Sequence, residues 1–109
     1  MSEIEEITKK ILQFRDARDW QQFHNSKDLA IALSIEASEL LELFLWQDNE
    51  SFDQKKFQDE LADVLTYCLL LAAKHRLSIP DIIANKLAKN EDKYPVQKAK
   101  GRSTKYTDL

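Results

Sequence analysis

A chain of 109 residues has room for one domain with a thin core, and 43% hydrophobic and 32% charged residues are typical of a globular protein. One glycine and two prolines are too few for a turn-rich fold, which favours long helices and excludes a Gly-rich phosphate loop. A net charge of −3, with no basic block inside the predicted helices, argues against a nucleic-acid polymer as partner.

Helical periodicity predicts four helices, at residues 3–18, 27–47, 53–76 and 80–93. Each follows a sequence that resembles a capping box at a helix N-terminus. These start signals are Ser2-x-x-Glu5, Asn25-x-x-Asp28, Ser51-x-x-Gln54 and Ser78-x-x-Asp81. Residues 94–109 have no periodic pattern and are predicted to form an irregular C-terminal tail. We therefore expect an all-α fold in one domain spanning 1–109, with neighbouring helices antiparallel because the connections are short.

The second and third predicted helices are apolar around much of their circumference. A helix that is apolar on two faces is buried on two faces, and four helices of this length cannot cover both. Homo-oligomerisation, as a dimer or a tetramer, is the simplest way to complete the core.

The N-terminus is acidic and lacks the apolar stretch of a signal peptide, and no apolar run approaches the ~20 residues that span a bilayer. Cys68 is the single cysteine, so an intramolecular disulfide is excluded. These features predict a cytoplasmic protein without a membrane partner.

Two acidic pairs stand in unexpected places. At about 100° per residue, Glu36 falls in the middle of an apolar stripe, flanked within about 20° by Leu29 and Leu43, and Glu39 lies at its edge. The next predicted helix repeats this arrangement, because Glu60 shares its face with apolar residues and Asp63 lies one turn further on. Four carboxylates are thus predicted to point into the bundle.

A carboxylate loses solvation on burial, and no Lys or Arg lies one turn from Glu36 or Glu39 to compensate. Cations inside the bundle would resolve this cost, and all-oxygen ligands favour Mg²⁺ or Mn²⁺ over zinc or iron. The alternative is that both pairs lie on solvated faces, since Glu-x-x-Glu is common on helices. The chain would then be a non-catalytic helical oligomerisation module; a third interpretation is a metal-binding carboxylate bundle.

Other residues are ambiguous by spacing alone. Lys86, Asn90 and Lys93 share one face of the last predicted helix, where they fit either a phosphate or a solvated surface. The aromatic side chains of Trp20, Trp46 and Tyr67 could stack on a base, although such residues more often belong to a core.

Longer stretches of the sequence resemble the dCTP pyrophosphatase branch of the MazG-like all-α NTP pyrophosphatase superfamily. The matching segments are Arg18-Asp19-Trp20-x-x-Phe23-His24, Glu36-x-x-Glu39-Leu40-x-Glu42-Leu43-Phe44-x-Trp46, Glu60-Leu61-x-Asp63-Val64-Leu65-x-Tyr67, Lys86-x-x-x-Asn90-x-x-Lys93-Tyr94-Pro95-Val96 and Gly101-x-x-x-Lys105-Tyr106-Thr107. Together they cover about 15–109.

This resemblance implies a four-helix fold that pairs into dimers, usually a dimer of dimers, and hydrolysis of a nucleoside triphosphate to a monophosphate and pyrophosphate. The implied role is cleansing the nucleotide pool. The implied Mg²⁺ ligands are Glu36, Glu39, Glu60 and Asp63, with Glu39 or Glu60 as general base. The implied substrate contacts are Trp20, His24, Trp46 and Tyr67 for the nucleoside and Lys86, Asn90 and Lys93 near the phosphates.

Two features depart from the family pattern near the expected base pocket. The connection at 47–52 is short, and Ile11 stands where some relatives have a polar residue. Preference for dCTP or a modified dCTP is an expectation from the resemblance.

Overall fold

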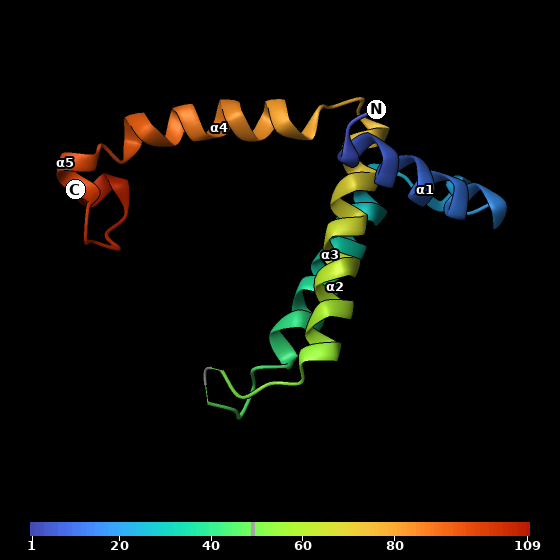
Figure 1. Ribbon diagram of the computed structural model, residues 1–109, viewed down its shortest axis with the longest axis horizontal. Coiled ribbons are helices and arrows are strands. Elements are labelled where there is room, and N and C mark those ends of the chain that lie inside the picture. Colours follow the sequence, from blue (N-terminus) through green and yellow to red (C-terminus); the bar gives the residue numbers. More distant parts are fainter. Residues whose placement is uncertain (49) are drawn as a thin grey trace. The chain divides into compact units, whose positions relative to one another are not determined.

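The computed structural model describes residues 1–48 and 50–109, and within them the chain forms five α-helices and no strand (Figure 1). The helices are α1 (Glu3–Ala17), α2 (Ser26–Glu42), α3 (Gln54–Lys74), α4 (Ile79–Lys93) and α5 (Val96–Ala99). Two 3₁₀ turns, η1 (Gln21–Phe23) and η2 (Tyr106–Asp108), complete the described elements. The all-α prediction and the four long helices are confirmed. The predicted connection at 47–52 includes residue 49, which lies outside the described residues.

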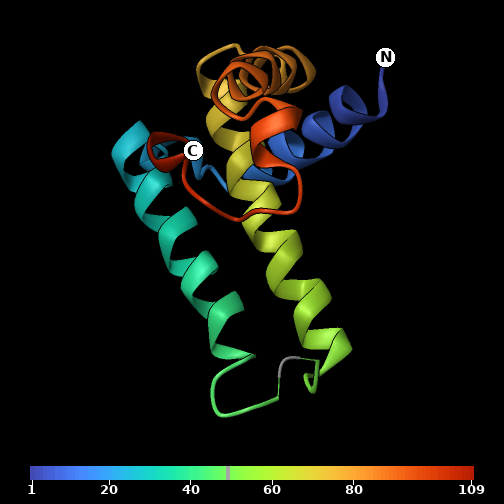
Figure 2. The same ribbon diagram turned by 90° about the vertical axis from the view of Figure 1, so that its left-hand side faces the viewer.

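The chain divides into two compact units, Met1–Arg76 and Leu77–Leu109. In the first unit, α2 and α3 run antiparallel side by side, and α1 also packs on α3 (Figure 2). A hydrogen bond of 2.8 Å between the Ser26 hydroxyl and His75 Nε2 joins the start of α2 to the end of α3. This contact fixes the antiparallel register at one end of the pair.

Side-chain caps explain where the helices begin. Ser2 and Glu5 form the expected capping box, and the side chain of Asn25 accepts a hydrogen bond from the backbone N–H of Asp28. The prediction that Ser51 begins the third helix is wrong. Asp53 is the N-cap of α3, where its carboxylate accepts bonds from the N–H groups of Lys55 and Lys56 at 3.0 and 3.2 Å. One carboxylate thus satisfies two backbone donors at the helix start.

The apolar pattern of α2 continues further than the helix. Prediction placed its end at residue 47, but α2 ends at Glu42 and the chain continues in tight turns to Trp46, whose φ is +62°. An aromatic cluster holds this end: the ring centroid of Phe52 lies 4.9 Å from that of Phe44 and 5.2 Å from that of Phe57. Packing of Phe44 into this cluster accompanies the early end of the helix.

The core of the first unit is small. Leu29, Leu70 and Ala72 are the buried hydrophobic residues of the described chain, at 2%, 5% and 7% exposure. Large apolar side chains on the same helices remain exposed: Ile31, Ile35, Leu41, Leu61 and Leu65. The protomer therefore leaves apolar surface of α2 and α3 in contact with water. None of the described helices has the length and apolar character needed to cross a membrane.

The second unit consists of α4 and the segment that follows it. Pro80 lies in the first turn of α4, and the Ser78 hydroxyl accepts a hydrogen bond from the backbone N–H of Asp81. The tail that was predicted to be irregular contains α5 and η2. It folds back so that Tyr106 packs edge-on against Tyr94, with ring centroids 5.9 Å apart, and lies under the Lys93 ammonium.

The cap of α3 gives a prediction about stability. Asp53→Ala removes the acceptor for two backbone N–H groups and should lower the free energy of unfolding by about 1 kcal/mol. Urea denaturation followed by circular dichroism measures the change. Asp59→Ala, which removes an exposed carboxylate from the interior of the same helix, is the matched control and should cost clearly less. Equal losses in the two variants would contradict the assigned cap.

Candidate functional site

Facing positions of α2 and α3 bring three carboxylates together. Glu36 comes from α2, whereas Glu60 and Asp63 come from successive turns of α3. One carboxylate oxygen of each lies within 4.8 Å of the other two. The antiparallel pairing of the helices therefore joins the two acidic pairs that the sequence singled out.

Two of these carboxylates have oxygens that nothing in the protein satisfies. Glu36 Oε2 and Glu60 Oε2 are buried and have no hydrogen-bond partner. The ion pair found among the described residues joins Arg15 to Asp16, so no salt bridge in that part of the chain compensates the trio. Buried, unpaired carboxylates are costly, and a bound cation would remove that cost.

The protonation of the trio reflects this burial. Loss of solvation, followed by the nearby carboxylates of Glu39, Asp63 and Glu60, raises the pKa of Glu36 to about 7. Burial also raises the pKa of Glu60, with the negative charge of Glu39 as the next cause. Clustered like charges favour the neutral acids, so the protein without a cation holds protons here that a metal would displace.

Glu39 lies beside the trio and is not part of it. It is half-buried one turn after Glu36 on α2, and its carboxylate raises the pKa of both Glu36 and Glu60. Of the four predicted ligands, the structure thus gathers three within ligand distance of one another and places the fourth close by. Oxygen-only donors with two unsatisfied buried atoms fit a hard divalent cation.

The predicted nucleoside contacts are distributed differently. The half-buried Tyr67 lies near the trio: burial raises the pKa of its hydroxyl, and the charges of Glu36 and Asp63 add to the shift. Trp20 packs edge-on against Phe14, with ring centroids 5.8 Å apart. Trp46 is fully exposed at 100% in the turn after α2. Tyr67 is therefore the predicted nucleoside contact for which the structure gives a link to the acidic cluster.

The predicted phosphate contacts belong to the second unit. Lys86, Asn90 and Lys93 lie on α4, where Asn90 is half-buried and the two lysines are exposed. Lys93 Nζ lies 4.8 Å from the ring centroid of Tyr106, so this lysine already has an aromatic partner within its unit.

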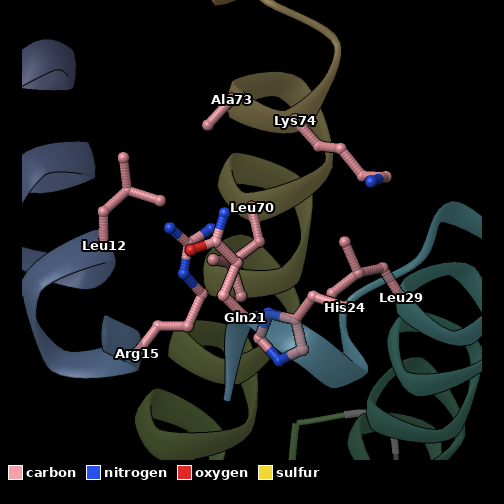
Figure 3. A pocket seen from close by; sticks show the side chains of 8 residues that line it. All are labelled: Leu12, Arg15, Gln21, His24, Leu29, Leu70, Ala73 and Lys74. Carbon is pink, nitrogen blue, oxygen red and sulfur yellow. The ribbon is translucent and has the colours of Figure 1, made fainter. Parts of the chain in front are cut away.

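His24 lines a cavity of about 330 Å³ in the first unit (Figure 3). The other lining residues are Leu12, Arg15, Gln21, Leu29, Leu70, Ala73 and Lys74. Sequence reasoning missed Arg15, Gln21 and Lys74. No motif connects them, because they come from α1, η1 and the end of α3 and meet only through tertiary packing.

Comparison with known proteins gives consistent matches. The model of the MazG-like family matches residues 31–109. The chain is 39% identical to dCTP pyrophosphatase 1 of Homo sapiens and 37% identical to that of Bos taurus, over 97% of this chain and 67% and 68% of those proteins. A crystal structure of a pyrophosphatase from Archaeoglobus fulgidus superposes with a TM-score of 0.82 at 34% identity, covering 87% of this chain and 94% of that one.

The raised pKa of Glu36 predicts how the metal-free protein responds to pH. The pKa is about 7 in the folded state and about 4.5 when exposed, so between these values the folded state binds more protons than the unfolded state. Stability should therefore fall as the pH rises from about 4.5 to about 7. Thermal unfolding in chelator across this range measures the trend.

Matched variants assign that trend to a residue. Glu36→Gln should flatten the slope, whereas Glu42→Gln, which changes an exposed carboxylate on the same helix, should leave it as in the wild type. Parallel slopes for wild type and Glu36→Gln would refute a raised pKa at this position.

Proposed function

This chain belongs to the MazG-like family and is a nucleoside triphosphate diphosphatase, and we propose that it hydrolyses dCTP or a modified dCTP to the monophosphate and pyrophosphate in a Mg²⁺-dependent reaction. The observation that carries this proposal is the carboxylate trio with its unsatisfied buried oxygens. The choice of dCTP is supported by relatives that carry this substrate in their names.

In this proposal Glu36, Glu39, Glu60 and Asp63 hold the metal. Their oxygens suit Mg²⁺, and Mn²⁺ is the natural substitute. When bound, the metal offsets negative charge on the triphosphate and lowers the pKa of a coordinated water. Glu39 belongs to the ligand set because its carboxylate influences both Glu36 and Glu60, and a small rotation of its side chain would complete the site.

The same carboxylates supply the proton acceptor. Water attacks a phosphorus at the α–β bridge, an O–P bond forms, and the bond from phosphorus to the bridging oxygen breaks as pyrophosphate leaves. Glu39 or Glu60 takes the proton of the attacking water as general base. A carboxyl whose pKa lies above the ordinary range, as burial and Glu39 arrange for Glu60, is the better base near neutral pH.

Substrate contacts are assigned from the resemblance and supported by exposure. Trp20, Trp46, Tyr67 and His24 are proposed to contact the nucleoside. The exposed indole of Trp46, held by a residue with a φ of +62°, is available for stacking. Lys86, Asn90 and Lys93, on one face of α4, are proposed to contact the phosphates. This requires that residues 1–109 act as one domain, with α4 near the acidic cluster.

Homo-oligomerisation is proposed to cover the apolar faces of α2 and α3. Ile35 is 52% exposed, Leu61 37% and Leu65 54%, although each lies on a helix that also carries the acidic cluster. Burying such side chains contributes roughly 1.5–3 kcal/mol each, so a dimer, assembled further into a tetramer, would offset the small core of the protomer. A cytoplasmic role in cleansing the nucleotide pool fits this activity.

A nucleotide panel tests the reaction. Each common dNTP and 5-methyl-dCTP is incubated with the protein and Mg²⁺, and pyrophosphate and orthophosphate are assayed separately. The proposal expects pyrophosphate in stoichiometric amount with monophosphate, with the highest kcat/KM for a cytosine nucleotide. Orthophosphate as first product would indicate cleavage at a different bond, and no product would favour a non-catalytic module.

The role of the acidic cluster is tested at Glu39. Glu39→Gln keeps the shape of the side chain and should lower kcat by about 10²-fold or more, the range for loss of a general base. The variant should keep the helical circular dichroism spectrum while losing much of the rise in melting temperature that Mg²⁺ gives the wild type. Glu42→Gln is the control and should behave as wild type. Full activity of Glu39→Gln would refute its assignment.

A further inference from the structure

The cavity that contains His24 has two kinds of wall. It occupies about 330 Å³ within the unit Met1–Arg76, where α1, η1, α2 and α3 meet (Figure 3). Its apolar part is made by Leu12, Leu29, Leu70 and Ala73. The polar part is made by Arg15, Gln21, His24 and Lys74, of which three are basic and none is acidic.

This cavity is separate from the acidic cluster. Leu29 precedes Glu36 by seven residues on α2, and Leu70 follows Asp63 by seven residues on α3. At 1.5 Å per residue, the cavity lies about 10 Å along the helix pair from the trio. No residue of the trio lines it. Its chemistry is also opposite, with cations where the trio has carboxylates.

The cations of the cavity are only partly neutralised. The Arg15 side chain is 15% exposed, and its Nε and Nη2 both approach Asp16 Oδ1, at 2.9 and 2.8 Å. Within the described residues, no hydrogen bond is found for Nη1 of Arg15, and no ion pair for Lys74. One carboxylate thus faces two permanent cations, and N–H donors remain for a ligand.

His24 adds an unsatisfied polar atom to the same cavity. Its Nδ1 is buried without a hydrogen-bond partner. Burial, followed by the charge of Arg15, lowers the pKa of the imidazole, so the ring is neutral near pH 7 and offers one N–H donor. A buried polar atom without a partner costs free energy that a bound acceptor would recover.

We propose that this cavity binds a small organic anion, an apolar group that carries one phosphate or carboxylate, and that it does so independently of the acidic cluster. The apolar group lies against the leucines, and the anionic group accepts hydrogen bonds from Arg15, His24 and Lys74. A pocket with an apolar wall and a few convergent polar groups is the usual form of a small-molecule site.

Titration of the full-length protein with phenyl phosphate, benzoate and inorganic phosphate tests the proposal. The ring nitrogens of His24 and the backbone amides of Gln21 and Leu70 are followed by ¹H–¹⁵N NMR. Phenyl phosphate or benzoate should give saturable shifts with the same Kd in Mg²⁺ and in chelator, and the tighter of the two identifies the anionic group. Inorganic phosphate should bind at least about tenfold more weakly, equivalent to ~1.4 kcal/mol, because it leaves the apolar wall unfilled.

Charge variants complete the test. Arg15→Gln and Lys74→Gln, on different helices, should each weaken binding several-fold, and about tenfold for Arg15. Lys10→Gln removes an exposed cation from α1 outside the cavity and should leave the Kd unchanged. The proposal is overturned if neither organic anion gives saturable shifts at His24. It is also overturned if Lys10→Gln and Lys74→Gln weaken binding equally, or if inorganic phosphate binds as tightly as phenyl phosphate.

Discussion

Antiparallel packing of α2 on α3 places Glu36, Glu60 and Asp63 within 4.8 Å of one another while leaving two of their oxygens buried without partners. Like charges at this separation repel, and burial removes the water that would screen them. Folding therefore works against this cluster until protons or a cation neutralise it. The raised pKa of Glu36 and Glu60 is the same conflict expressed as proton affinity.

The rest of the protomer has little free energy to spare for such a conflict. Three buried hydrophobic residues form the core, and the helices that carry the carboxylates expose large apolar side chains. Caps at Ser2, Asn25, Asp53 and Ser78 and the Ser26–His75 bond stabilise the helices locally. A cation in the cluster and a second copy against the apolar faces would each add stability that the protomer lacks. Binding sites often store destabilisation of this kind.

Charge is separated along the same pair of helices. The middle of α2 and α3 carries the acidic cluster, and the end where α1 and η1 join them carries the basic cavity of Arg15, His24 and Lys74. The two regions are about 10 Å apart along the helix axes, so each is within range of the other's field at physiological salt. A cation and an organic anion bound at the two places would favour each other electrostatically.

Local features of this protein were determined by sequence alone. Helical periodicity and caps identified all four long helices, because they depend on neighbours within a few residues, and the i, i+3 acidic pairs share a face for the same reason. The resemblance to MazG-like enzymes was also readable from the motifs. Tertiary structure decided which carboxylates meet, that α2 ends at Glu42, that Asp53 and not Ser51 caps α3, and that Arg15, Gln21 and Lys74 surround His24. Contacts of this kind join residues that are distant in sequence or compete for one backbone donor, and no local pattern records the outcome of that packing.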